Sequence, residues 1–507
     1  MKRLIVLLIF LITFFIYSYK ISEVPVHLNQ DELGFSINAY SIAKTGYDEN
    51  GRFLPLNFWH LGVVWATPII VYLTAIFLIF LPLTESVIRL PSVFVGVVDV
   101  VLIYLVARKW FKSDNFGFLA AVLLLLTPVH FIHSRILLDN LYPVPFVLLW
   151  LFYLMKYMEE GKIRLVFLAT LFLGISIHTY NAPKLIMPAF FLVTLILVLP
   201  KVKHKLESLL VSVLGFLIPL VPLFIWQRSN STLQDLLYFY GVYNTSQSPI
   251  QAVSRLLSVE SLSQKFVTYT SYFDPWFLFS RGDTSLAHST GQIGAFLLPF
   301  IVLLPLGFYQ IIRKDNSRIN LLLLFGFLTS PIAAAIVGQP YRISRALVML
   351  PFAVLIAIYG VKFLINKRVM GRLVLSVLLI YMPIQFIVFV TGYFNNYPAR
   401  SYRQFNYNIQ GAYEEIIAKA KDDTGAIYID NKIPFADRYW KFYLIKNQKE
   451  DLLRKTIFFD AANLVSVPSN SLILFRFDSS SDQQLGLDLI EKIKEPDGFV
   501  SAYLYRN

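Results

Sequence analysis

The chain of 507 residues contains no cysteine. Disulfide bonds, a thiolate nucleophile and cysteine-ligated metal sites are therefore excluded. Charge is also scarce, because only 15% of the residues are Asp, Glu, Lys or Arg, whereas roughly 25% is usual in a soluble protein. This deficit argues against an ordinary soluble domain and indicates that much of the surface faces lipid.

Long apolar runs take the place of the missing charge, and 56% of the residues are hydrophobic. A transmembrane helix needs about 20 apolar residues, because the hydrocarbon core is about 30 Å thick. The sequence therefore predicts an all-α polytopic membrane protein with about eleven transmembrane helices. The predicted spans lie near residues 4–19, 87–107, 116–132, 141–158, 163–179, 184–200, 206–226, 292–312, 319–337, 346–365 and 372–392.

The first span resembles a signal peptide, with Lys2 and Arg3 before an apolar run. It lacks a small-residue cleavage site, so we expect it to remain as the first helix. The formal net charge of +13 is spread over short loops and forms no single patch, so we expect no nucleic-acid partner. These features predict a multi-pass protein of the plasma (inner) membrane that contacts membrane lipid.

The apolar stretch 66–82 is long enough to span a bilayer, but the charges of the later loops argue that it does not cross. Cytoplasmic loops are enriched in Lys and Arg. If 66–82 does not cross, every basic loop after the first span is cytoplasmic. We therefore predict an interfacial or re-entrant helix at 66–82, a cytoplasmic N-terminus and an extracytoplasmic C-terminus. The basic loops hold Arg108, Lys109 and Lys112; Lys162 and Arg164; Lys201, Lys203 and Lys205; Arg313, Lys314 and Arg318; and Lys367, Arg368 and Arg372.

The composition changes after the last predicted span. Residues 396–507 alternate predicted helices and strands, which is typical of a small α/β domain, here expected outside the membrane. It follows a transmembrane domain at 1–395, whose long outer loops are 20–86, with interfacial helices, and 227–290. Helices are expected at 412–423, 437–446 and 487–495, and strands at 426–430, 471–477 and 499–505.

Two adjacent acids, Asp31 and Glu32, precede a helix-like stretch in the first outer loop. Neighbouring residues on a helix do not face each other, so they do not form the opposed carboxylates, about 5 Å apart, of a retaining glycosidase. One of them is suited to act as a general base while the other orients a partner. In the alternative interpretation, both acids simply favour the start of the helix.

A second polar group, HSRILLDN, lies between two closely spaced spans and holds His133, Arg135, Asp139 and Asn140. Charges beside hydrocarbon usually pair with one another or serve a site. The sequence therefore predicts either a site at this turn or a local Arg135–Asp139 pair. Asp99 lies in the middle of a span, and we expect it to pair within the helix bundle.

Cations also occur at the outer ends of other spans. Arg342 and Arg345 lie there against the positive-inside bias, and a guanidinium suits phosphate; the alternative is anchoring to lipid head groups. Lys184 is either a further site residue or a side chain that extends to the interface. Asp283 and His288, in the long loop, are weaker candidates for which a plain loop role is favoured.

In combination, these segments resemble the GT-C superfamily of membrane glycosyltransferases. The closest likeness is to the bacterial branch similar to protein O-mannosyltransferases and lipid A aminoarabinose transferases, over roughly residues 1–395. The motifs that carry the resemblance are QDE at 30–32, GYDENGRFLPLNFW at 46–59, ESVIRLPSVFVG at 85–96, HSRILLDN at 133–140, FDPWFLFSRGD at 273–283, SPIAAAI at 330–336 and YRISRALVMLP at 341–351.

The resemblance implies a polyprenyl-phosphate sugar donor, an inverting mechanism and an active site in the outer loops. By motif match, Asp31 is the expected base, Glu32 its partner, Asp139 the second acidic position and Arg345 a ligand of the donor phosphate. Asn140 stands where the family has the second acid of a pair, which leaves the role of Asp139 open. The remaining candidates for binding the donor phosphate or sugar are Arg135, Lys184, Arg342 and His133.

The predicted function is therefore sugar transfer from a polyprenyl-phosphate carrier to an envelope acceptor, whether protein, lipid or glycan. Alternatives are a secondary transporter or lipid-carrier flippase, a polysaccharide polymerase or ligase, and a non-catalytic envelope protein. The histidines lack zinc spacing, and no Gly-rich phosphate loop or nucleophile elbow is present. No metal site or required cofactor is predicted, although the outer acids are compatible with a divalent cation. The sequence does not identify the sugar, the carrier length or the acceptor.

Overall fold

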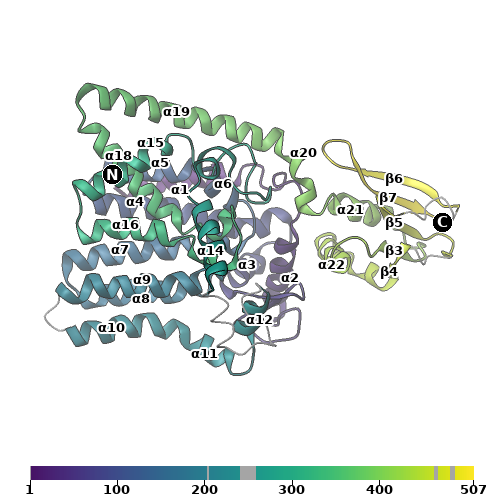
Figure 1. Ribbon diagram of the computed structural model, residues 1–507. Helices are drawn as coiled ribbons and strands as arrows, with labels where there is room; N and C mark the ends of the chain where they lie inside the picture. Colours follow the sequence, from purple (N-terminus) through teal and green to yellow (C-terminus); the bar gives the residue numbers. More distant parts are fainter. Residues whose placement is uncertain (1, 202–204, 240–257, 462–465, 480–485) are drawn as a thin grey trace. The chain divides into compact units, whose positions relative to one another are not determined.

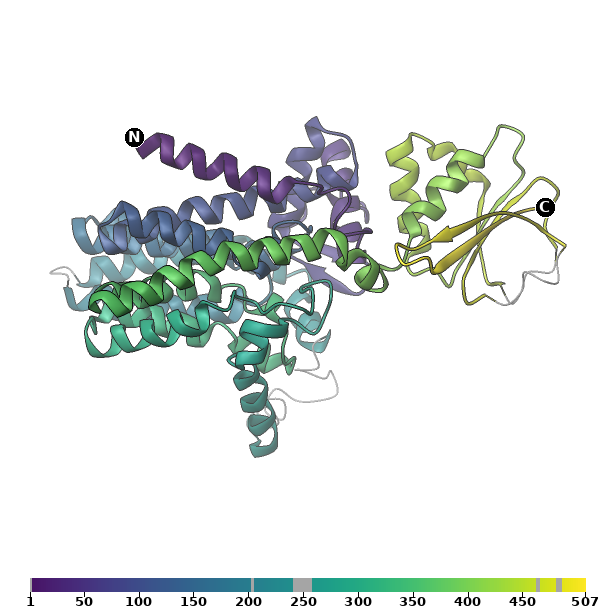
Figure 2. The same ribbon diagram turned by 90° about the horizontal axis from the view of Figure 1, so that it is seen from above.

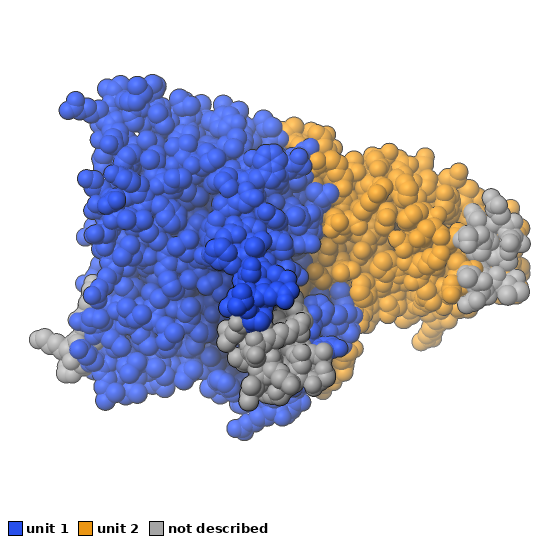
Figure 3. Space-filling model, in the orientation of Figure 1, with its two compact units in different colours: residues 1–19, 55–70, 91–390 blue, residues 20–54, 71–90, 391–507 orange. Residues whose placement is uncertain are grey.

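Figure 1 shows the computed structural model of the chain, in which residues 2–201, 205–239, 258–461, 466–479 and 486–507 are described. These residues fall into two compact units, coloured separately in Figure 3. The first unit comprises residues 1–19, 55–70 and 91–390, and the second comprises residues 20–54, 71–90 and 391–507. Lys203, one of the predicted cytoplasmic cations, lies outside the described residues.

The first unit is built of apolar helices, because a backbone in lipid has to satisfy its hydrogen bonds internally. Helix α8 (Ile163–Ser176) contacts α7 (Val144–Glu160), α9 (Pro183–Val198) and α10 (Lys205–Leu217), which lie side by side in Figure 1. The other elements lying wholly in this unit are α1 (Lys2–Ser18), β1 (Phe58–His60), β2 (Val64–Ala66), α5 (Asp114–Leu125), α6 (Pro128–His133), η1 (Asp139–Leu141), η2 (Leu199–Lys201), η3 (Ile218–Leu220), α11 (Val221–Gln227), α12 (Thr232–Phe239), α14 (Val259–Ser271), η4 (Phe277–Arg281), α15 (Phe300–Arg313), α16 (Arg318–Thr329), α17 (Ile332–Val337), η5 (Ile343–Arg345) and α18 (Met349–Ile365).

The centre of this unit is α18, which is almost entirely buried and contacts α5, α7, α15 and α16. Two glycines let α15 and α18 approach closely. A Cβ atom at Gly307 would lie 2.0 Å from the carbonyl oxygen of Ile356, and one at Gly360 would lie 2.1 Å from that of Leu303. Small residues commonly allow such backbone contact between helices in membranes.

Five helices in the described part of the chain are long and apolar enough to cross a membrane, and shorter apolar helices lie in the other predicted spans. Two of these helices are shorter than predicted, because α5 ends at Leu125 within 116–132 and α15 begins at Phe300 within 292–312. The mostly helical, membrane-type fold is therefore confirmed, whereas the number of crossings and their direction stay predictions. Helix α3 (Pro68–Phe80), at the predicted interfacial stretch, has 13 residues. The five long helical segments are Glu85–Phe111, Asp139–Glu160, Lys205–Gln227, Arg318–Val337 and Arg368–Asn395.

The second unit contains a five-stranded sheet in the order β4-β3-β5-β7-β6, with α21 and α22 beside it (Figure 2). Strand β3 is parallel to β4 and β5, whereas β7 is antiparallel to β5 and β6. The predicted small C-terminal α/β region is thus confirmed. Its elements are α20 (Tyr397–Ser401), η6 (Tyr402–Phe405), α21 (Ile409–Lys419), β3 (Ile427–Asp430), α22 (Ala436–Asn447), η7 (Glu450–Lys455), β4 (Thr456–Phe459), β5 (Leu472–Arg476), β6 (Asp488–Lys494) and β7 (Val500–Arg506).

One prediction for this region is wrong. The segment 487–495, expected to be a helix, forms strand β6. Its apolar residues have a spacing that suits either structure, and the tertiary context decides between them. Gly498, with φ of 87°, lies in the tight turn that joins β6 to β7, and pairing with β7 supplies the backbone hydrogen bonds of the strand. Strand β4 was also not predicted.

The same unit includes part of the predicted first outer loop. Helix α2 (Gln30–Thr45) packs against α22, and the hydroxyl of Tyr439 donates to the carbonyl oxygen of Leu28 at 2.8 Å. Lys446 pairs with Glu85 at 2.8 Å and with Glu414 at 2.7 Å. Burial alone would lower the pKa of Lys446, but its hydrogen bonds to these carboxylates outweigh burial and raise the pKa. The helices α4 (Glu85–Phe111) and α19 (Arg368–Asn395) have residues in both units.

Candidate active site

Asp31 and Glu32 lie in the first turn of α2, two and three residues after its N-cap Asn29. The Asn29 side chain accepts a hydrogen bond from the backbone N–H of Asp31 at 2.9 Å, and the Asn29 N–H donates to Glu32 at 3.0 Å. These contacts form a capping box, which satisfies backbone donors at the start of a helix. The alternative interpretation, in which the acids favour the start of the helix, is therefore correct for Glu32, which caps α2.

Glu32 is fully buried and bound on both oxygens by Arg89, which is itself 1% exposed. The Arg89 Nε lies 2.8 Å from Glu32 Oε1, and Nη2 lies 3.0 Å from Oε2. Arg89 was not among the predicted site residues, although an arginine inside the apolar ESVIRLPSVFVG segment was a signal for it. The other partners of Arg89 are the carbonyl oxygens of Ile21 at 3.0 Å, Pro25 at 3.0 Å and His27 at 2.8 Å.

Asp31 differs from Glu32 because it keeps partial solvent exposure. Its carboxylate lies within electrostatic reach of the Tyr439 hydroxyl, which comes from α22. A general base needs contact with the group that it deprotonates, and Glu32 has both oxygens occupied by Arg89. Of the two acids, Asp31 is therefore the one that is suited to proton transfer.

In the first unit, Asp139 and Lys184 come together from different segments of the chain. Thr67, which follows β2, donates to Asp139 at 3.4 Å and to the carbonyl oxygen of Thr179 at 2.9 Å. Lys184, at the start of α9, donates to Asn181 at 2.6 Å and interacts electrostatically with Asp139. The structure thus groups two predicted site residues with Thr67, which the sequence analysis did not identify.

Arg345 lies on an element that contacts this group. It ends η5, and η5 contacts η1, which begins with Asp139. The Arg345 Nε donates to Gln339 at 2.5 Å, and Nη1 donates to the Tyr180 hydroxyl at 3.4 Å. Because guanidinium and ammonium groups bind phosphate oxygens well, these residues form a candidate phosphate site. We call Asp139, Lys184 and Arg345 the outer cation cluster, after its two cations and the side of the membrane that the sequence predicts for them.

Arg342 lies next to this cluster in sequence but has its own acidic partner. Its Nη1 lies 3.6 Å from Oδ1 of the buried Asp283. Asp283 also accepts hydrogen bonds from the backbone N–H groups of Ser285 at 2.8 Å and Ile343 at 2.7 Å. Asp283 therefore holds the loop that leads into η5. The Arg342 side chain remains 40% exposed, so it is still available to a ligand.

His133 and Arg135 are buried and make contacts within the protein. The rings of His133 and His288 stack with their centres 5.1 Å apart, and His133 Nε2 lies 3.1 Å from His288 Nδ1. Burial, followed by the charges of His133 and the two nearby arginines, lowers the pKa of His288. Arg135 donates to the carbonyl oxygen of Tyr17 at 2.7 Å and stacks over Phe131. These contacts suit structural roles, and donor binding by His133 and Arg135 stays a prediction.

Asp99, the mid-span acid, has a partner inside the helix bundle, as expected. Its Oδ2 lies 3.2 Å from His130 Nε2, and His130 Nδ1 lies 2.8 Å from the Tyr17 hydroxyl. All three residues are fully buried. Over the described part of the chain, no group of three or more His, Asp or Glu side chains is placed to hold a metal ion.

The raised pKa of the buried Asp283 carboxyl predicts that the stability of the folded protein depends on pH. Burial raises its pKa from 3.8 to about 6, although the Ser285 N–H and Arg342 oppose the shift. The folded state therefore binds this proton more tightly than the unfolded state does. The resulting stabilisation is complete below pH 3.8 and is lost as the pH rises to about 6.

We expect the melting temperature of the wild type, measured in detergent, to fall more steeply across this pH range than that of Asp283→Asn. The exposed Asp423→Asn serves as the control, because it removes a carboxylate from a loop of the second unit. Parallel curves for the wild type and Asp283→Asn would contradict the prediction.

The chain is similar to known membrane glycosyltransferases in part of its sequence and in its fold. Residues 66–226 match the family model for dolichyl-phosphate-mannose-protein mannosyltransferase. A search of curated proteins finds no match. Among solved structures, the chain resembles ArnT from Cupriavidus metallidurans bound to undecaprenyl phosphate, at 12% identity and a TM-score of 0.59, over 99% of this chain and 97% of that chain. Its apo state gives a TM-score of 0.60 with the same identity and coverage.

The archaeal oligosaccharyltransferase AglB from Archaeoglobus fulgidus, in complex with an inhibitory peptide and a dolichol-phosphate, is more distant. It shows 13% identity and a TM-score of 0.45, over 87% of this chain and 64% of that chain. The likeness to ArnT extends over nearly the whole of both chains and shows a shared fold. Together with the family match, it confirms the predicted resemblance to membrane glycosyltransferases.

Proposed function

We propose that the protein is an inverting glycosyltransferase that moves a sugar from a polyprenyl-phosphate carrier to an acceptor in the cell envelope. The observation that carries the proposal is the outer cation cluster, which groups Arg345 and Lys184 with Asp139. It occurs in a chain with the fold of ArnT, a protein whose structure holds undecaprenyl phosphate. The match of residues 66–226 to a mannosyltransferase family model supports the same class of reaction.

In the proposed reaction, Arg345 and Lys184 bind the carrier phosphate. As the bond between the sugar and the phosphate breaks, negative charge grows on the phosphate oxygens, and fixed cations stabilise that charge. The carrier leaves as polyprenyl phosphate. Tyr180 and Gln339 hold the Arg345 side chain through their hydrogen bonds, and Asn181 holds Lys184 in the same way.

The general base is assigned to Asp31. It takes the proton of the acceptor hydroxyl, whose oxygen then attacks the anomeric carbon on the face opposite the phosphate. One displacement of this kind inverts the configuration of the sugar. Glu32 acts as a positioning residue, because its contacts with Asn29 and Arg89 fix the first turn of α2. The extracytoplasmic side is the proposed location of this chemistry.

The function is tested with purified protein in nanodiscs. It is incubated with a panel of radiolabelled polyprenyl-phosphate sugars and envelope extract, and the label is followed from the carrier to an acceptor. Transfer to an extract component supports the proposal and allows that acceptor to be isolated. In a parallel assay with proteoliposomes, label that crosses the vesicle membrane on an unchanged carrier supports a flippase. Label that extends a lipid-linked glycan supports a polymerase.

Arg345→Gln is expected to raise the KM for the donor about tenfold or more, because one charge-assisted contact to phosphate is lost. The kcat is expected to fall as well, since the same charge stabilises the leaving phosphate. Initial rates over a range of donor concentrations separate the two effects. Arg281→Gln is the matched control, since Arg281 lies in the same unit and stacks over Trp276. Equal donor KM values for both variants would remove Arg345 from phosphate binding.

A further inference from the structure

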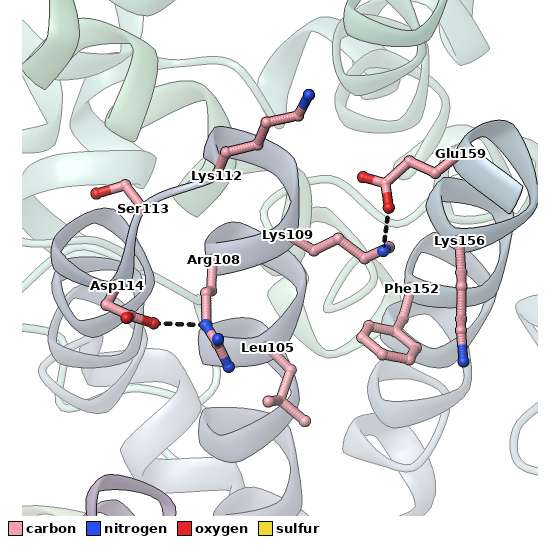
Figure 4. Close-up of a pocket in the computed structure, with 9 residues that line it drawn as sticks. All are labelled: Leu105, Arg108, Lys109, Lys112, Ser113, Asp114, Phe152, Lys156 and Glu159. Atoms are coloured by element: carbon pink, nitrogen blue, oxygen red, sulfur yellow. Dashed lines mark hydrogen bonds and ion pairs between the residues drawn. The ribbon is translucent and has the colours of Figure 1, made fainter. Parts of the chain in front are cut away.

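A second charged site lies away from the outer cation cluster, in the same unit. A pocket of about 620 Å³ opens between the end of α4, the start of α5 and the later part of α7 (Figure 4). Helix α7 begins at Val144, just after η1, and the pocket residue Lys156 lies twelve residues further along. At 1.5 Å per residue, this separates the two sites by about 18 Å along α7. The pocket therefore does not belong to the outer cation cluster.

The charged residues around the pocket are predominantly cationic. Arg108, Lys109, Lys112 and Lys156 line it, whereas its acids are Asp114 and Glu159. Arg108 pairs with Asp114, and Lys109 pairs with Glu159, as the dashed lines in Figure 4 show. These pairs neutralise two of the four cations.

Lys112 and Lys156 remain as the cations that the pocket acids do not neutralise. Lys112 has no ion-pair partner among the residues that the structure describes, and it is exposed just after the end of α4. Lys156 has only a long contact of 3.7 Å with Glu160 on the same helix, and exposed pairs of this kind contribute little. The two ammonium groups come from different helices, and in Figure 4 their side chains extend in different directions on either side of the Lys109–Glu159 pair.

The inner wall of the pocket is apolar. Leu105 lies one turn before Arg108 on α4, and Phe152 lies one turn before Lys156 on α7. Both are only partly buried. The pocket is therefore amphipathic, with hydrocarbon further into the helix bundle and cations at the helix ends. An inorganic anion would contact the cations alone, whereas a phospholipid would contact both the cations and the apolar wall.

We propose that this pocket binds the head group of an anionic phospholipid. On binding, the long side chains of Lys112 and Lys156 turn from either side toward the lipid phosphate, and the first acyl carbons lie against Leu105 and Phe152. Basic pockets at the cytoplasmic ends of transmembrane helices commonly bind such head groups, and the pocket volume is in the range of small-molecule sites. The positive-inside pattern places this end of α4 in the cytoplasmic leaflet.

The proposal is tested by native mass spectrometry of the full-length protein in detergent, titrated with phosphatidylglycerol or with phosphatidylcholine. We expect phosphatidylglycerol to bind the wild type about tenfold more tightly than it binds the double variant Lys112→Gln/Lys156→Gln, since two cationic contacts are lost. The control is Lys314→Gln/Arg318→Gln, which removes two exposed cations from another loop of the same unit. It is expected to bind like the wild type.

Three results would overturn the proposal. The first is equal binding of phosphatidylcholine and phosphatidylglycerol, which would indicate an apolar groove without anion recognition. The second is complete competition by inorganic phosphate at similar concentrations, which would indicate an anion site that does not need a lipid. The third is the same loss of binding in both double variants. Melting temperatures without added lipid check that the variants are folded, and none of these outcomes depends on sugar transfer.

Discussion

Replacing Asp31 with Asn is expected to abolish sugar transfer while leaving the protein folded. The amide has nearly the same shape as the carboxylate but does not accept a proton at neutral pH. General-base catalysis typically accounts for about 10²–10⁴-fold in rate, so the kcat should fall by that order. The backbone N–H of Asp31 still donates to Asn29, and the capping box of Asn29 with Glu32 is unaffected.

The measurement is the initial rate of label transfer in nanodiscs, together with the melting temperature of each protein in detergent. The donor KM should stay close to the wild-type value, because Asp31 is not assigned to the phosphate. Glu23→Gln is the matched control, since Glu23 is an exposed acid of the same unit and pairs with Lys20, three residues earlier, in an exposed ion pair. Transfer by Asp31→Asn at the wild-type rate would remove Asp31 from the role of base. A large drop in its melting temperature would show a structural role instead.

Arg89→Met is expected to have the largest effect on stability of any single change considered. It leaves Glu32 as a buried charge without its guanidinium partner and removes a donor from the carbonyl oxygens of Ile21, Pro25 and His27. Removing one member of a buried ion pair typically costs about 3–5 kcal/mol. We expect a markedly lower melting temperature and a low yield of folded protein.

The double variant Glu32→Met/Arg89→Met tests the cause of this loss. A buried pair that is replaced as a whole by apolar side chains is often tolerated, so the double variant should be more stable than Arg89→Met alone. Lys20→Met is the control, because the Lys20–Glu23 pair is exposed, and exposed pairs contribute about 0–1 kcal/mol. Equal melting temperatures for Arg89→Met and Lys20→Met would contradict the role given to Arg89.

These two predictions separate chemistry from folding at adjacent positions. Asp31→Asn should lose activity and keep stability, whereas Arg89→Met should lose stability first. The distinction rests on burial, because Glu32 has no exposed surface and Asp31 keeps some. A dipeptide of two acids does not reveal which of them is buried.

Several residues of the candidate site could be predicted from the sequence, because charged residues at the edge of a membrane usually pair with one another or serve a site. Arg345 and Lys184 stand out at the ends of apolar spans, and the structure groups them with Asp139. Thr67 and Gln339 gave no comparable signal, since neutral polar residues are common in loops. The partner of Asp283 was also hidden, because Arg342 lies 59 residues further along the chain.

The sequence by itself determined the membrane class, the approximate positions of the apolar helices and most of the C-terminal α/β elements. Lipid leaves the backbone few alternatives to a helix, so long apolar runs in a sequence directly predict membrane helices. Only the tertiary structure decided that 487–495 is a strand, since pairing with β7 outweighs the local pattern. It also decided that Arg89 binds Glu32, 57 residues away, because long-range contacts between buried charges depend on how the chain folds back on itself.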